Sequence, residues 1–150
     1  KGETNMACNM NCKRVFWGGL VSGAVIVMIE WITHEVILKD HWATIVAQGH
    51  CFAAPVFMYT PFAILFSFGV GMLLAWLYAA ARDTLHPGPT AALKVGLAVG
   101  FIAGVPANFA MAAWCPMGYF LPFVMCVATF AEYVIATYLA AWIYQPKPAT

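Results

Sequence analysis

Carboxylates, an imidazole and an amide lie within long apolar stretches of this sequence. Glu30 and His34 are four residues apart, so a helix would place them on one face. Glu132 lies about 13 residues, or roughly 20 Å of helical rise, inside its own stretch, and Asn108 belongs to a third stretch. Each such group costs a few kcal/mol at the centre of a bilayer unless it is paired or hydrated. We therefore predict an intramembrane polar cluster of Glu30, Asn108 and Glu132, with His34 at its mouth.

Two interpretations of this polar cluster stay open. In the first, the carboxylates form a path for protons or cations, and His34 passes protons at the mouth. In the second, the cluster is structural, and a protonated Glu132 donates a hydrogen bond to a backbone carbonyl or pairs with Thr137 or Tyr133. A path needs polar residues at successive depths, and the opposite half of each stretch offers few, which favours the structural interpretation.

The same residues can be compared with the ligand patterns of known metal and cofactor sites. A di-iron carboxylate site uses a Glu-x-x-His motif, with spacing i and i+3, on two helices, whereas Glu30 and His34 are four apart and residues 119–144 contain no histidine. A bis-histidine haem needs a second histidine inside the membrane, and the other three lie outside the apolar stretches: His41, His50 and His86. His34 stays a candidate ligand for one haem or chlorophyll, although an interfacial histidine satisfied by Glu30 or water is the favoured interpretation. The histidines and cysteines match no standard zinc spacing, so the sequence requires no metal and no cofactor.

Composition indicates that the elements carrying these residues cross a membrane. Of the 150 residues, 63% are hydrophobic and 9% are charged, against about a quarter charged in an average soluble domain. Four stretches reach the roughly 20 apolar residues that a membrane span requires: residues 15–38, 61–81, 91–114 and 119–144. We predict an all-α, four-helix membrane bundle that forms a single domain over residues 1–150. Residues 41–48 form either a short interfacial helix or an ordered loop over the bundle.

Basic residues predict the orientation of this bundle. Lys and Arg near span ends favour the cytoplasmic side, and all of them except Lys39 fall on one side: Lys1, Lys13, Arg14, Arg82, Lys94 and Lys147. Both termini are therefore expected in the cytoplasm. The first apolar stretch is too long for the core of a signal peptide, so we expect it to remain as an anchor. A formal net charge of +1 indicates no nucleic-acid partner.

Glycines spaced by four residues predict close helix packing. Gly19 and Gly23 form one such pair in the first stretch, and Gly96, Gly100 and Gly104 form two in succession in the third. Small-residue faces of this kind let helix backbones approach closely inside a membrane. These faces either meet each other within the bundle or serve a partner subunit or a second copy of the chain.

Local matches between segments indicate an internal duplication. Residues 19–23 match residues 96–100, and residues 75–78 match residues 141–144. Each match joins corresponding members of two helical hairpins that begin on the same side. The pattern therefore predicts two parallel repeats, related by an axis along the membrane normal.

Two cysteines are candidates for a disulfide. Cys51 and Cys115 both fall on the outer side of the predicted bundle, where an oxidising compartment permits disulfides. A bridge would tie one hairpin to the other by closing a loop of about 60 residues. The alternative is a pair of free thiols on the same side.

Two longer segments carry a family resemblance. The segment GVGMLLAWLYAAAR at 69–82 and the following HPGPTAALKVGL resemble small bacterial four-span membrane proteins. NCKRV at 11–15 and AAWIY at 140–144 fit the same pattern. The resemblance covers nearly the whole chain through apolar motifs. It implies a four-helix protein of a bacterial inner membrane and implies no activity.

These observations leave three function classes. We expect a non-catalytic accessory subunit of a larger energy-converting or transport complex, because no nucleophile, base and orienting group occur together. Such a subunit would lie in the lipid bilayer and pack through its glycine faces against other membrane subunits or a second copy. The alternative is a small proton or solute transporter that uses the polar cluster. A third class is a redox or pigment-binding subunit that uses His34.

Overall fold

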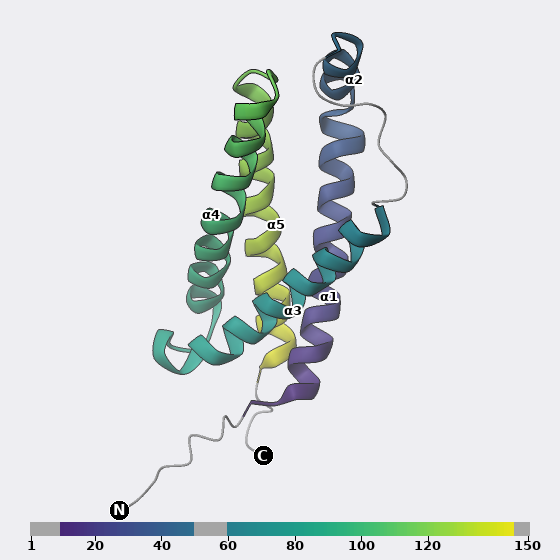
Figure 1. The fold of residues 1–150 in the computed structure, drawn as a ribbon. Coiled ribbons are helices and arrows are strands. Elements are labelled where there is room, and N and C mark those ends of the chain that lie inside the picture. Colours follow the sequence, from purple (N-terminus) through teal and green to yellow (C-terminus); the bar gives the residue numbers. More distant parts are fainter. Residues whose placement is uncertain (1–9, 50–59, 146–150) are drawn as a thin grey trace, which may run out of the picture.

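The computed structural model describes residues 10–49 and 60–145, and within them every regular element is a helix (Figure 1). In chain order these are α1 (Cys12–Ile32), the π-helical turn η1 (Thr33–Ile37), α2 (Lys39–Ala47), α3 (Thr60–Leu85), α4 (Pro89–Trp114) and α5 (Phe120–Tyr144). Four helical stretches are long and apolar enough to cross a membrane: α1 with η1, α3, α4 and α5. The predicted all-helical, multi-pass architecture is confirmed.

The two helix boundaries that differ most from the predicted spans do so for local reasons. α1 begins earlier because the side chain of Asn11 accepts a hydrogen bond from the N–H of Arg14 at 3.2 Å and caps the helix. α3 continues to Leu85 and ends where His86 adopts a φ of 63°. His86 precedes Pro87, and the residue before a proline is disfavoured in the helical region.

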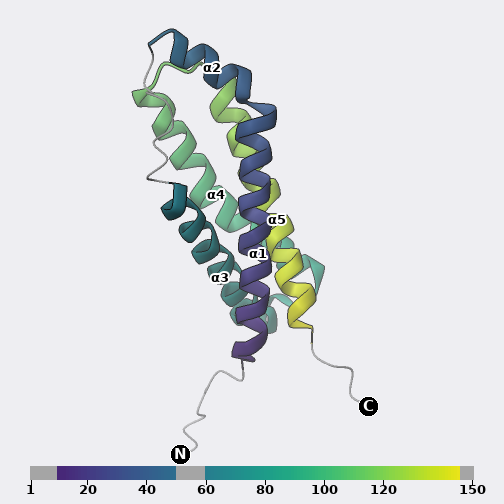
Figure 2. The same cartoon turned by 90° about the vertical axis from the view of Figure 1, so that its right-hand side faces the viewer.

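The bundle has two different ends (Figure 2). At one end, the N–H of Asn11 donates to Tyr144 Oη at 3.1 Å, and Arg14 donates to the Gln145 carbonyl. The start of α1 and the end of α5 therefore meet there, and we call this the terminal end. The short helix α2 lies at the opposite end, which we call the α2 end. Between the ends, α1 packs on α3 and α5, and α4 packs chiefly on α5.

The glycines of α1 pack against α3. A Cβ at Gly19 would lie 2.8 Å from Met72 Cα, and one at Gly23 would lie 2.7 Å from Phe68 Cα. In return, a Cβ at Gly71 of α3 would lie 2.7 Å from Gly23 Cα. The two backbones approach so closely that each position excludes a methyl group.

The glycines of α4 pack against α5 in the same manner. A Cβ at Gly96 would lie 2.7 Å from Val134 Cα, and one at Gly104 would lie 2.9 Å from Thr129 Cγ2. Gly100 sits between them, against Phe130. The α1 and α4 faces thus do not meet each other; each is covered by another helix of the same chain.

Apolar side chains seal the half of the bundle nearer the terminal end. One buried cluster contains Ile26, Leu74, Val95, Tyr133 and Ala136. A second, closer to the terminal end, contains Tyr78, Ala79, Ala91, Ala92, Ala141 and Tyr144. In this region the fully buried Ser22 donates a hydrogen bond to the Ala136 carbonyl at 2.7 Å, which joins α1 to α5.

Candidate functional site

A cavity of about 120 Å³ lies among α1, η1, α4 and α5, toward the α2 end. Polar side chains line it on several sides. Among the described residues, the lining consists of Glu30, Thr33, His34, Asn108, Met125, Ala128, Thr129 and Glu132. The structure thus brings together all four members of the sequence-predicted polar cluster, although they come from helices up to about 100 residues apart.

Local departures from regular helix lie close to the cavity. η1 closes with a hydrogen bond from the N–H of Leu38 to the carbonyl of Thr33 at 2.9 Å, a span of five residues rather than four. Such π-turns are rare and concentrate at functional sites. On α4, Pro106 lies within the helix two residues before Asn108, and a proline there removes one backbone hydrogen bond. The end of the α1–η1 stretch and the middle of α4 are therefore both irregular close to the cavity.

The two carboxylates have different surroundings. Glu30 accepts a hydrogen bond from Ser67 Oγ of α3 at 2.8 Å, and the same hydroxyl lies 3.0 Å from the Ala63 carbonyl. Glu132 is only 4% exposed and lies against the cavity. Thr137 donates to the carbonyl of Tyr133 at 2.6 Å, so its hydroxyl serves its own helix. The pairing of Thr137 with Glu132 considered from the sequence is absent.

The cavity lining carries two carboxyl groups without a lysine or an arginine. Neither residue type occurs among the described residues that line it, and the ion pair found in the described part of the chain, Arg82 with Asp83, lies at the terminal end. The oxygen atoms of carboxyl, amide and hydroxyl groups accept hydrogen bonds and are the ligands that small hard cations prefer. The arrangement favours a proton or a small cation.

His34 links the cavity to α2. Trp42 Nε1 donates to His34 Nδ1 at 3.1 Å, and the two rings stack with their centroids 5.8 Å apart. Because Nδ1 accepts this hydrogen bond, the ring nitrogen left for a proton or a ligand is Nε2. Trp42 also packs on the buried cluster at the α2 end: Ile45, Cys115, Met117 and Leu121. α2 therefore contacts both a cavity residue, His34, and the buried cluster at the α2 end.

A haem or chlorophyll does not fit this cavity. Sites for drug-sized ligands occupy about 300–1,000 Å³, well above the 120 Å³ found here. The imidazole of His34 is also held by Trp42 through both its edge and its face. Among residues 10–49 and 60–145, no group of three or more His, Cys, Asp or Glu side chains is placed to hold a metal ion.

The candidate disulfide lies partly outside the described residues. Cys115 is buried at the end of α4 and is disulfide-bonded, whereas Cys51 lies outside the described residues. The Cys51–Cys115 pairing therefore stays a prediction. Cys12 and Cys126 are free thiols.

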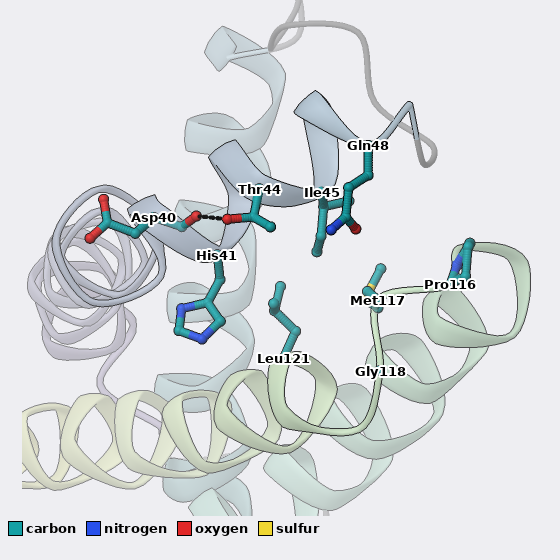
Figure 3. Close-up of a pocket in the computed structure, with 9 residues that line it drawn as sticks. All are labelled: Asp40, His41, Thr44, Ile45, Gln48, Pro116, Met117, Gly118 and Leu121. Atoms are coloured by element: carbon teal, nitrogen blue, oxygen red, sulfur yellow. Dashed lines mark hydrogen bonds between the residues drawn. The ribbon is translucent and has the colours of Figure 1, made fainter.

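A larger surface hollow, of about 500 Å³, lies between α2 and the connection from α4 to α5 (Figure 3). Its polar groups come from one side, and all belong to α2 or its end: Asp40, His41, Thr44 and Gln48. Thr44 donates to the carbonyl of Asp40 at 2.8 Å, and His41 stacks on Phe120 with 4.7 Å between ring centroids. The polar groups do not converge from several elements, so this hollow is a weaker candidate than the cavity.

Sequence reasoning missed some groups of the cavity. Ser67 is polar and lies within an apolar stretch, but it is far from Glu30 along the chain, so spacing gave no reason to pair them. Thr33 and Thr129 also line the cavity, and neither was predicted to do so. These residues could have been found from their distance to the end of each span. Each lies about as deep in the membrane as one of the two carboxylates.

Comparisons with known proteins leave the chain's own residues as the basis for a function. No protein-family model, curated protein or solved structure matches this chain. The geometry of the cavity and the charges that line it are therefore the grounds on which a function can be inferred.

Proposed function

We propose that this protein is a small membrane transporter that binds a proton or a small cation at the cavity between Glu30 and Glu132. The observation that carries the proposal is the convergence of two carboxylates, Asn108 and His34 on one intramembrane cavity, with no Lys or Arg among the described residues that line it. A charged group this deep in a membrane is costly unless it is paired or hydrated. A proton or cation bound between the carboxylates would lower that cost.

We further propose the direction of access. Buried apolar clusters lie between the carboxylate cavity and the terminal end, which supports access to the cavity from the α2 end. Most of the described basic residues lie toward the terminal end, and such residues favour the cytoplasmic side. In this proposal the protein lies in a bacterial inner membrane with both termini on the cytoplasmic side. The cavity and α2 then lie toward the outer side.

The packing of the two hairpins bears on the proposed duplication. In α1 and α3, a glycine pair packs on Phe68 and Met72; in α4 and α5, a glycine pair packs on Phe130 and Val134. In each hairpin, the two residues that contact the glycine pair are four residues apart. The sequence match, however, aligns Met72 with Tyr138, one helical turn beyond Val134. We propose repeats that share a packing mode and have since shifted by one turn.

Flux through reconstituted protein tests the transporter proposal. Proteoliposomes with an imposed potential and an internal pH dye should show proton uptake, and parallel sodium and potassium gradients test other small cations. Glu132→Gln and Glu30→Gln should lose most of the flux, because each removes one carboxylate of the cavity. Glu35→Gln is the matched control, since Glu35 neighbours His34 but is exposed and does not line the cavity.

Two results would contradict the proposal. The first is wild-type protein, shown to be folded and inserted, that carries neither protons nor these cations. The second is flux that Glu132→Gln and Glu30→Gln leave at the level of Glu35→Gln. Either result would leave the polar cluster a structural feature of the bundle.

The accessory-subunit role stays a second proposal, with a different contact surface. The five glycines expected to face a partner are covered within the chain. Gly69 of α3 is exposed with open space beside it, so this helix face is open to a neighbouring subunit or a second copy. Mild extraction from the native membrane, followed by native electrophoresis and mass spectrometry, separates the roles. Stable co-migration with other subunits supports the accessory role, and migration alone supports the transporter.

A further inference from the structure

A second cavity, of about 560 Å³, lies at the terminal end between the α3–α4 connection and α5. An arginine and several aromatic rings line it, together with the proline-rich connection: Tyr78, Arg82, Pro87, Gly88, Pro89, Tyr138, Ala141, Trp142 and Gln145. It shares no residue with the carboxylate cavity.

Arg82 is held inside this cavity with donor capacity that the chain does not use. Its side chain is 18% exposed, and its Nε is buried without a hydrogen-bond acceptor among the described residues. The nearest carboxylate oxygen belongs to Asp83 at 3.5 Å, and the Asp83 side chain is 87% exposed. The guanidinium carbon lies 5.2 Å from the centroid of the Tyr144 ring, which fixes it at the cavity wall. Nε itself is shielded, so a ligand in the cavity meets the exposed part of the guanidinium, and an anion with several acceptor oxygens pairs with that group best.

The surroundings of the cavity indicate where such an anion comes from. Trp142 is 70% exposed and Tyr138 is 37% exposed, so α5 presents both rings outward beside the cavity. They lie near the end of a membrane-spanning helix, where amphipathic rings meet lipid headgroups. Arg14 donates to the carbonyl of Gln145, which places a second guanidinium beside the rim. Basic pockets between spanning helices are the sites that bind anionic headgroups.

We propose that this cavity binds the phosphate of an anionic membrane phospholipid. Arg82 donates to the phosphate oxygens, and Tyr138 and Trp142 contact the lipid where it leaves the cavity for the bilayer. The volume of about 560 Å³ suits a headgroup with its glycerol. A free phosphate offers the same acceptor oxygens, so the experiment must distinguish the two sources.

Lipid titration of the whole purified chain in detergent tests the site. Phosphatidylglycerol should raise the midpoint of thermal unfolding, and phosphatidylcholine with the same acyl chains should not. Arg82→Gln should weaken the apparent affinity for phosphatidylglycerol by about tenfold, the effect expected for a lost hydrogen bond to a charged group. Lys94→Gln is the control, because Lys94 is exposed on α4 and lies outside the cavity; it should bind as the wild type does.

A phosphate control and a fluorescence measurement complete the test. Inorganic phosphate alone should not stabilise the protein, and stabilisation equal to that by phosphatidylglycerol would overturn the assignment to lipid. If Arg82→Gln fails to fold, quenching of tryptophan fluorescence in the wild type replaces it. Phosphatidylglycerol with brominated acyl chains should quench more than the matching phosphatidylcholine, and Trp142→Phe should abolish the difference. Equal quenching by the two lipids, or equal binding by Arg82→Gln, would refute the site.

Discussion

Replacement of Gly96 by alanine tests whether backbone contact between α4 and α5 determines the stability of the bundle. A Cβ there would lie 2.7 Å from Val134 Cα and 3.0 Å from the Tyr133 carbonyl oxygen, and both atoms are backbone. Carbon atoms prefer a separation of about 3.5–4.0 Å, so α5 must move by roughly 1 Å. Overpacking costs about 1–3 kcal/mol, against a gain of about 0.5–1 kcal/mol from alanine in a helix interior. The expected net loss is roughly 1–2 kcal/mol in the free energy of unfolding.

Unfolding in mixed micelles by increasing detergent denaturant, followed by tryptophan fluorescence, measures this loss. Gly69→Ala is the matched control, because Gly69 also lies inside a spanning helix but has no atom within 4 Å of an added Cβ. Its stability should stay unchanged or rise by up to about 1 kcal/mol. If Gly96→Ala proves as stable as Gly69→Ala, the two helices are not in backbone contact and the reasoning is refuted.

Two hydrogen bonds around the carboxylate cavity give further predictions. Ser67→Ala removes the donor to Glu30 and should lower the free energy of unfolding by about 0.6 kcal/mol, with reduced flux in the liposome assay; unchanged flux would separate Ser67 from the proposed pathway. Trp42→Phe keeps a ring over His34 but removes its N–H donor, so the amides of α2 should exchange hydrogen faster in mass spectrometry. Exchange at the wild-type rate would show that stacking and apolar packing alone hold α2 in place.

The sequence contains enough information for the number and type of the spans, but it does not specify which helices are neighbours. Hydropathy reports length, and the described residues contain four helical stretches of spanning length. Gly23 and Gly96 were predicted to pack, and both do. Their partners on α3 and α5 were not predictable, because any helix of similar apolarity can cover a small-residue face.

The candidate site divides in the same way. Glu30 and Glu132 stand out from sequence alone because a carboxylate within an apolar stretch is rare and costly. Their shared cavity depends on how α1, α4 and α5 are placed around it, which spacing along the chain does not encode. Ser67 and Arg82 were missed for a related reason. Each acts across helices, on Glu30 and at the wall of the second cavity.

The distribution of close contacts limits how such a bundle can change shape. Backbone contact through glycine is closer between α1 and α3 and between α4 and α5 than between α1 and α5, where a Cβ at Gly18 would lie 3.4 Å from Ala140 Cα. A transporter that takes a cation from the α2 end must at some stage open the apolar half near the terminal end. That opening has to separate the two pairs from one another, because separation within a pair would break the closest contacts of the fold. The hydrogen bond from Ser22 to the Ala136 carbonyl crosses the boundary between the pairs at 2.7 Å. It lies in the sealed half, so opening of that half requires this bond to break.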